Sequence, residues 1–159
     1  MVNQNHYLSA SDITRLPEIH DKHQFNENAV RVTRRLSDGT GLQRLGIHLV
    51  RLQPGKESTQ FHTHDANEEF LYILEGEGVA DIGEQTINVG RGDFMGFPTG
   101  SSAHTMRNES DSDLVYLMGG ERNLPDVVHY PRINRSMIKS EHTRKYIDWD
   151  ALHDIGPGR

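Results

Sequence analysis

Two histidines separated by one residue, His62 and His64, are the most distinctive chemical feature of the sequence. Alternate side chains of an extended strand point to one face, so both imidazoles are expected on the same face. Glu69 follows five residues later. A tight turn over residues 65–68 would return the next strand beside the first and bring this carboxylate to the imidazoles. Two imidazoles and one carboxylate can hold a divalent metal ion and leave coordination positions open.

His104 is the expected fourth ligand, because it alternates with Met106 and Asn108 in another predicted strand. Three neutral imidazoles with one carboxylate suit one divalent transition metal ion, such as Zn, Fe, Mn or Ni. The set suits Ca or Mg poorly, because those ions prefer shells of oxygen ligands. The ligand types leave the choice among the transition metals open.

Four further side chains share the faces of the predicted ligands through the two-residue period of a strand. They are the candidates for a substrate pocket: Gln60, Leu71, Ile73 and Met106. Packing in the core is the alternative for Met106, because methionine fills irregular gaps. A roomy cavity with polar groups near the metal would favour an enzyme, whereas a cavity closed by the apolar members would favour a vestigial site.

The pattern places no lysine, arginine or tyrosine at this site as a general acid or base. Tyr72 and Tyr116 are the nearest candidates, although Tyr72 is expected on the face opposite Glu69. Asn108 is expected to stabilise a turn, and His48 to face solvent or the mouth of the site. The remaining histidines of interest are expected to be structural or on the surface: His20, His23, His129, His142 and His153.

The elements that would position these side chains are short strands. A two-residue period runs through residues 45–49, 70–74, 87–89 and 114–118, and each is a candidate for a short strand. Turns rich in glycine and proline separate these segments. Short strands spaced by about 8–12 residues are typical of an all-β sandwich or barrel.

The composition excludes several classes of function. The chain has no cysteine, which excludes disulfides, cysteine-ligated zinc, iron–sulfur clusters and thiol catalysis. A net charge of -6 with scattered basic residues gives no reason to bind nucleic acid or an anionic membrane. The longest apolar run has five residues, whereas a membrane span needs about 20. With no secretory signal at the N-terminus, a cytoplasmic location is expected.

The length of 159 residues fits one domain. We expect an N-terminal arm over residues 1–29, a barrel over residues 30–120 and a C-terminal arm over residues 121–159. The first arm is expected to hold a short helix capped by Ser11 or Asp12.

The C-terminal arm is expected to be extended, with a short helix over residues 143–153. Its apolar residues, Trp149 among them, are too numerous for a solvated tail. We therefore expect Trp149 to be at least partly buried, and the arm to cover an outer barrel face or a partner subunit. Because all predicted ligands precede it, the arm is expected to lie apart from the metal site and to be dispensable for metal binding.

Two segments resemble the motifs of the cupin superfamily. Residues 55–78, GKESTQFHTHDANEEFLYILEGEG, resemble the first motif, G(x)5HxH(x)3-4E(x)6G. Residues 92–108, GDFMGFPTGSSAHTMRN, resemble the second, G(x)5PxG(x)2H(x)3N. One extra residue precedes His62 and another precedes His104, each in a predicted turn. The resemblance implies an all-β double-stranded β-helix, or jelly-roll barrel, whose metal ligands are His62, His64, Glu69 and His104.

The resemblance also implies a range of activities. Related cupins include dioxygenases, decarboxylases, isomerases and lyases that act on small molecules, and the ligands alone do not select one. The leading interpretation is therefore a single-domain metalloenzyme of undetermined reaction. The alternative is a non-catalytic cupin that binds or senses a small molecule.

A homodimer is expected as well. Cupins commonly pair their barrels through N-terminal strands, and the apolar content of 34% is low for a self-sufficient domain. We expect residues 30–35 to form the open strand edge that a partner would cover.

Overall fold

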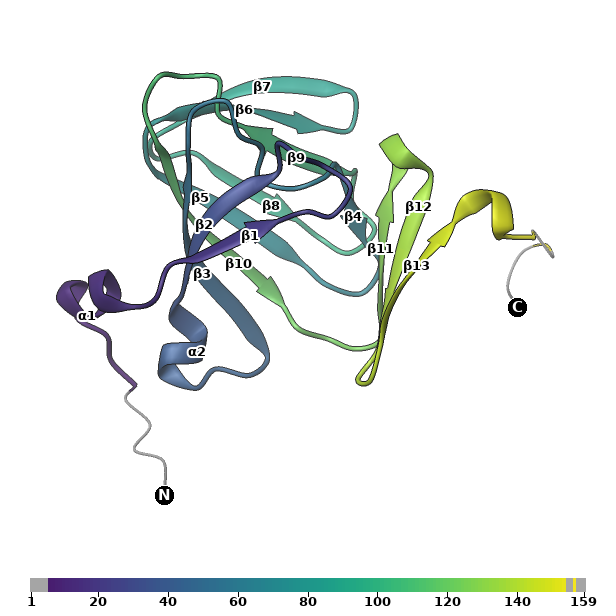
Figure 1. The fold of residues 1–159 in the computed structure, drawn as a ribbon, viewed down its shortest axis with the longest axis horizontal. Helices are drawn as coiled ribbons and strands as arrows, with labels where there is room; N and C mark the ends of the chain where they lie inside the picture. Colours follow the sequence, from purple (N-terminus) through teal and green to yellow (C-terminus); the bar gives the residue numbers. More distant parts are fainter. Residues whose placement is uncertain (1–5, 154–155, 157–159) are drawn as a thin grey trace.

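The computed structural model describes residues 6–153 and residue 156. The ends of the two predicted arms, residues 1–5, 154–155 and 157–159, lie outside this description. The described residues form thirteen strands in three antiparallel sheets (Figure 1), which confirms the all-β prediction. Among these residues, no helix combines the length and the apolar character needed to cross a bilayer.

The largest sheet has six strands and forms one side of the barrel. Its order is β1 (Ile19–Lys22), β2 (Val30–Arg35), β3 (Leu45–Leu52), β10 (Leu114–Glu121), β5 (Glu69–Glu75) and β8 (Phe94–Phe97). The predicted alternation holds in β10, where Leu114 and Tyr116 are fully buried and Val115 is half-buried. The inward residues form an apolar core whose fully buried members are Val50, Leu52, Ile73, Leu114 and Tyr116.

Two smaller sheets complete the molecule. The three-stranded sheet has the order β7 (Gln85–Gly90), β6 (Glu77–Ile82) and β9 (His104–Arg107). The four-stranded sheet has the order β13 (Arg144–Asp148), β12 (Arg135–Lys139), β11 (Asp126–Tyr130) and β4 (Thr63–His64). Figure 1 shows β11, β12 and β13 as a separate layer beside the barrel.

Short helices occupy the periphery: α1 (Ala10–Arg15), α2 (Leu36–Thr40) and two 3-10 turns, η1 (Pro131–Ile133) and η2 (Trp149–Ala151). The predicted N-terminal helix is present, but its cap is Ser9 rather than Ser11 or Asp12. The Ser9 side chain accepts from the Asp12 amide, and the Asp12 carboxylate accepts from the Ser9 amide. The helix ends at Leu16, whose extended ψ of 142° is the conformation that a following proline favours.

The prediction that residues 30–35 form an open edge is wrong. Strand β2 pairs with β1 on one side and with β3 on the other. The N-terminal segment therefore covers this edge within the same chain, by placing His20 opposite Val32.

The C-terminal segment is a sheet rather than an extended arm. Val128 pairs with Met137, and Met137 pairs in turn with Tyr146. The two prolines of the segment do not interrupt a strand, because Pro125 precedes β11 and Pro131 begins the turn that follows it.

The prediction of a helix over residues 143–153 is also wrong, because pairing between strands determines the structure of this segment. Residues 144–148 form strand β13, because their backbone pairs with β12, whereas an isolated helix of this length has little stability of its own. Only the 3-10 turn η2 is helical in this range. Trp149 is half-buried, as expected, and its indole N–H donates to Ser136 Oγ at 2.8 Å.

Candidate metal centre

The four predicted ligands come from three sheets that meet at one end of the barrel. Glu69 begins β5, His104 begins β9 and His64 ends β4. His62 lies just before β4 and forms a two-way backbone bridge with His104, with N–O distances of 3.0 and 2.8 Å. Three of the four side chains therefore lie on strands, and His62 lies in an isolated bridge just before β4.

The predicted return of the chain over residues 65–68 is wrong. Strand β4 does not pair with β5, because its partner is β11, through His64 opposite Val128 and Thr63 opposite His129. Glu69 reaches the histidines from a strand held between β10 and β8. The site is thus formed across sheets rather than within one hairpin.

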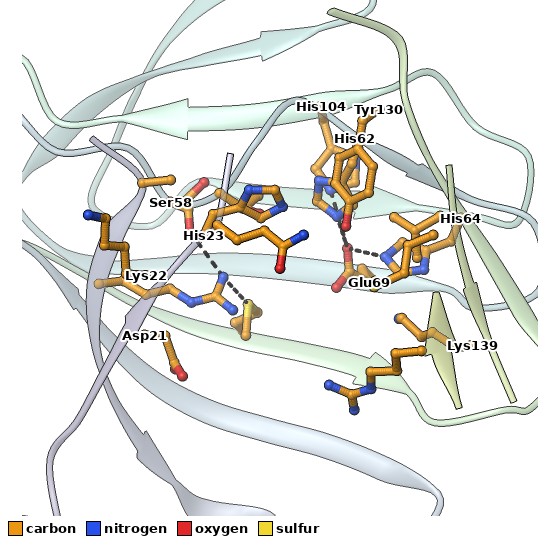
Figure 2. A pocket seen from close by; sticks show the side chains of 18 of the residues that line it. Asp21, Lys22, His23, Ser58, His62, His64, Glu69, His104, Tyr130 and Lys139 are labelled. Atoms are coloured by element: carbon orange, nitrogen blue, oxygen red, sulfur yellow. Dashed lines mark hydrogen bonds and ion pairs between the residues drawn. The ribbon is translucent and has the colours of Figure 1, made fainter. Parts of the chain in front are cut away.

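One carboxylate oxygen lies at the centre of the group. Glu69 Oε2 is 3.3 Å from His62 Nε2, 3.3 Å from His104 Nε2 and 3.5 Å from His64 Nε2 (Figure 2). The ligand atoms of His62, Glu69 and His104 all lie within 4.8 Å of one another. Such a group can hold a metal ion, and His64 approaches the same oxygen from a third direction.

The ring orientations follow from what lies behind each imidazole. His62 Nδ1 is 3.0 Å from the backbone carbonyl oxygen of Gln60, and His64 Nδ1 is 2.8 Å from Asp126 Oδ2. Both oxygens only accept hydrogen bonds, so each Nδ1 carries the proton, and in the neutral rings that a metal requires each Nε2 lone pair faces Glu69. The ring of Phe97 stacks on His104 at a centroid distance of 3.5 Å and fixes its plane.

These residues fit a divalent transition metal. In the tautomers just described, the Nε2 lone pairs of His62 and His64 point at a carboxylate oxygen that also carries lone pairs. A cation between them removes this repulsion, and the set of three nitrogens and one carboxylate suits zinc, iron, manganese or nickel. Cupins commonly hold such an ion, and the donor set does not distinguish which one is bound.

The electrostatics keep the carboxylate charged. Burial by itself raises the pKa of Glu69, but His104, His62 and His64 outweigh it and hold the pKa well below the usual value. Burial lowers the pKa of His62, although Glu69 opposes this. Burial also lowers the pKa of His64, but Glu69 and Asp126 together raise it above its ordinary value.

The four predicted pocket residues have different positions. Leu71 lines the cavity beside the metal centre. Ile73 and Met106 are buried in the apolar core instead. Gln60 supports His62 through its backbone, while its side-chain oxygen accepts from Asn26 Nδ2 at 3.2 Å. The site is therefore not closed by apolar side chains.

The cavity beside the metal centre measures about 600 Å³. Its lining includes polar side chains that the sequence analysis did not assign to the site: His23, Arg31, Tyr116, Tyr130 and Lys139. The expectation that His23 is a surface residue is wrong. The sequence analysis named Tyr116 only as a nearby tyrosine. The two-residue period of the strand now seen as β10 could have shown that its side chain points inward.

The C-terminal sheet forms one wall of this cavity. Tyr130 and Lys139 line it from β11 and β12 (Figure 2), and Asp126 supports a ligand from behind. The expectation that residues 121–159 lie apart from the site is therefore wrong. Their contribution depends on pairing between distant segments, which a local sequence pattern does not contain.

Other predicted roles can be compared directly with the structure. Asn108 stabilises a turn, as expected, by donating to the carbonyl oxygens of Leu52 and Ser112 at 2.8 and 2.7 Å. His129 has a structural role, with ring nitrogens 2.8 Å from Ser136 Oγ and 3.0 Å from Asp65 Oδ1. His48 is half-buried and does not line the cavity.

Comparison with known proteins identifies the family. Residues 48–120 match the family described as Cupin domain. A provisionally assigned sugar phosphate isomerase from Acidithiobacillus ferrooxidans is 35% identical, with a TM-score of 0.92 over 95% of this chain and 97% of its own. A sugar phosphate isomerase of the cupin superfamily from Silicibacter pomeroyi is 26% identical, with a TM-score of 0.80 over 91% of this chain and 94% of its own.

More distant structures share the fold alone. A polyketide cyclase from Streptomyces resistomycificus is 18% identical, with a TM-score of 0.62 over 76% of this chain and 84% of its own. A comparison with curated proteins finds no match. The matched domain and the 35% identity over nearly the whole chain agree with the motifs and the barrel, and this chain belongs to the cupin superfamily.

Proposed function

We propose that the protein is a metal-dependent isomerase of sugar phosphates. The observation that supports this most directly is the 35% identity, over 95% of the chain, to a protein provisionally assigned that activity. The second relative, at 26% identity, is described in the same way. Both likenesses extend over the C-terminal sheet as well as the barrel, so they include the segments that form the cavity.

The cavity chemistry is consistent with this reaction. Conversion of an aldose to a ketose moves one hydrogen between two neighbouring carbon atoms and needs no oxidant or reductant. A bound divalent metal would supply Lewis acid chemistry, by polarising the carbonyl and the neighbouring hydroxyl oxygen of the sugar. The His62, His64 and His104 rings are held in fixed planes, so the substrate oxygens would meet a rigid centre.

We assign Tyr130 as the residue that holds a proton near the reacting carbon atoms. Its side chain lines the cavity and lies next to Glu69 in Figure 2. Burial raises the pKa of Tyr130, and the neighbouring Tyr146 raises it further. The phenol therefore stays protonated at neutral pH and can donate at Oη to a substrate oxygen.

The proposal is tested with a panel of aldose and ketose phosphates in deuterated water. Proton NMR is expected to show interconversion of one pair of sugar phosphates. Deuterium at the carbon atom would indicate transfer of the hydrogen through a base that exchanges with solvent, and its absence would indicate direct transfer between the two carbon atoms. The variant His62→Ala/His64→Ala is the control and is expected to be inactive. A metal-loaded protein that binds members of the panel without converting any would contradict the proposal and favour a sensing module. Release of carbon dioxide or uptake of oxygen would indicate a decarboxylase or a dioxygenase.

A further inference from the structure

The cavity has a second polar region away from the metal centre. Figure 2 separates the labelled side chains into two groups, with Lys22, His23 and Ser58 at one end and Glu69 and the three imidazole ligands at the other. All of these side chains line the same cavity. A small molecule bound to the metal centre would therefore extend toward the end where His23 and Ser58 lie.

Arg31 projects into this second region from β2. Its Nη1 atom donates to the carbonyl oxygen of Ser58 at 3.1 Å and contacts Met118 Sδ at 3.8 Å. No carboxylate of the described residues lies within 4.0 Å of its guanidinium, although Asp21 faces it across the strand pair. A guanidinium has five N–H donors, so most of them are left for another partner.

Tyr116 lies close enough to Arg31 for the guanidinium to interact with its hydroxyl oxygen, but the proton of that hydroxyl has no acceptor among the described residues. It is fully buried in β10, it lines the cavity, and within residues 6–153 no hydrogen-bond partner exists for its hydroxyl. Burial raises the pKa of Tyr116 to about 12, although the charge of Arg31 opposes this increase. The hydroxyl therefore keeps its proton and presents a buried donor to the cavity.

His23 completes the group with a third donor. Its Nδ1 atom accepts from the Phe25 amide at 3.3 Å, so in the neutral ring the proton is on Nε2. That Nε2 atom is buried and has no partner among the residues that the structure describes. Burial lowers the pKa of His23, and the charge of Arg31 lowers it further, so the ring is neutral. Arg31 therefore lies near both His23 and Tyr116.

The charges that line the cavity favour an anion. Of the four cationic side chains that line it, Lys22 pairs with Glu27 at 2.6 Å and Lys139 with Asp126 at 3.1 Å, whereas Arg31 and Arg144 have no ion-pair partner among the described residues. The whole chain has the opposite sign, with a net charge of -6. A cationic cavity in an acidic protein attracts anionic ligands selectively to that position.

We propose that Arg31, Tyr116 and His23 form a subsite that binds the anionic end of the substrate, a phosphate or a carboxylate group. Three residues with unused N–H or O–H donors line this cavity, and none of them is paired with a carboxylate of the described residues, which matches an oxyanion and does not match a cation or an apolar group. The proposal rests on the proposed function, because it assigns the phosphate of a sugar phosphate to this end of the cavity. Anion binding can nevertheless be measured without turnover.

The test is calorimetric titration of the purified full chain with inorganic phosphate and, separately, with acetate. One of the two anions is expected to bind at one site per chain, and the comparison identifies which. Arg31→Gln is expected to weaken that binding at least about tenfold, because a charge-assisted hydrogen bond is lost. Tyr116→Phe, which keeps the shape of the ring, is expected to weaken it severalfold. Arg34→Gln is the matched control, because Arg34 lies in the same strand but pairs with Glu18 at 2.7 Å.

The variant His62→Ala/His64→Ala separates this subsite from the metal centre. Binding that persists in this variant and is weakened by Arg31→Gln supports the subsite. Equal binding by Arg31→Gln and Arg34→Gln, or binding lost only with the metal ligands, would overturn it. An anion that binds through Arg31 to a protein with no isomerase activity would leave the subsite standing and refute the proposed function.

Discussion

Asp126 Oδ2 lies 2.8 Å from His64 Nδ1, so a fully buried carboxylate of the C-terminal sheet stands directly behind a candidate metal ligand. The same oxygen accepts from Lys139 Nζ at 3.1 Å. Residues that orient a histidine ligand in this way set both its tautomer and its basicity. The pair therefore couples the C-terminal sheet to the metal centre.

Replacement of this carboxylate is expected to weaken metal binding. Asp126→Asn keeps an acceptor for His64 but removes the charge, and we expect metal affinity to fall by about 10- to 100-fold. Competition with a coloured chelator measures the change. Asp65→Asn is the control, because the Asp65 side chain is more than half exposed and pairs with His129 rather than with a candidate ligand. Equal affinity in both variants would show that Asp126 has no part in holding the ligand.

Metal content and its pH dependence test the ligand assignment. We expect one divalent transition metal ion per chain by elemental analysis, and none in His62→Ala/His64→Ala. Imidazoles must be neutral to bind a metal. Because the pKa of His64 is raised above 6.5, protons compete for this ligand first as the pH falls. Because burial lowers the pKa of His62, that ring stays neutral to lower pH. Affinity is therefore expected to decrease from about pH 8 to pH 5, and constant affinity would count against imidazole ligands.

Asp81 is expected to stabilise the contact between the barrel and the C-terminal segment. Its carboxylate accepts from Arg107 and from Arg132 of η1, each at 2.8 Å. Burial alone raises the pKa of Asp81, but the two arginines outweigh it and lower the pKa from 3.8 to about 2. The stabilisation is thus complete above about pH 4 and is lost as the pH falls through 2.

The variant Asp81→Asn is expected to reduce the free energy of unfolding by about 2 kcal/mol at neutral pH. Urea denaturation at pH 7 and at pH 3 measures the difference, which is expected to shrink at the lower pH. Glu84→Gln, in the exposed turn between β6 and β7, is the control. A loss of stability that is the same at both pH values would exclude the ion pairs as its cause.

Tyr130→Phe tests the assignment of the proton donor. The variant removes one oxygen and keeps the ring, so we expect metal content to be unchanged and kcat to fall about 100-fold. Turnover of the sugar phosphate pair identified by NMR gives the rate. Tyr72→Phe is the matched control, because Tyr72 lies on the outer face, is 40% exposed and does not line the cavity. Full activity in Tyr130→Phe would assign the proton to another group.

The homodimer stays a prediction, although the strand edge at which its interface was expected is already paired within the chain. The outer face of the six-stranded sheet offers a surface for a second copy, because Tyr72, Leu74 and Phe94 are 40%, 39% and 65% exposed there. Light scattering at micromolar concentration is expected to give twice the chain mass of 18.1 kDa. Phe94→Glu is expected to shift the particle toward the single chain mass. A monomeric wild-type protein would refute the dimer.

The residues that sequence could place are those governed by short-range periodicity. The spacing of His62 and His64 predicted that both imidazoles share one face, and the alternation around Tyr116 marked a buried strand. Each of these inferences needs only the two-residue period of a strand and the turns between strands. The same rule put Tyr72 on the outer face, where it is 40% exposed.

The parts that sequence could not place depend on pairing across long separations. Asp126 contacts a residue 62 positions earlier, and nothing near it in the chain marks that contact. The alternation of the strand that contains Arg31 is visible in the sequence. The pairing of that strand's edge with Ile19–Lys22 is not visible there. Pro125 and Pro131 favoured an extended arm, because proline disfavours the middle of a sheet. In the structure both lie at strand ends, and this position becomes visible only once the register is known.

The pairing of β11 with β4 has a consequence for the order in which the protein matures. Ribosomes make the chain from its N-terminus, so all four candidate ligands emerge by residue 104, before the wall that contains Asp126, Tyr130 and Lys139. A nascent chain of that length also lacks β10, the strand that lies between β3 and β5. The His64 ring therefore gains the carboxylate that orients it only once the C-terminal sheet has been synthesised, and the oriented metal site is complete only at that stage.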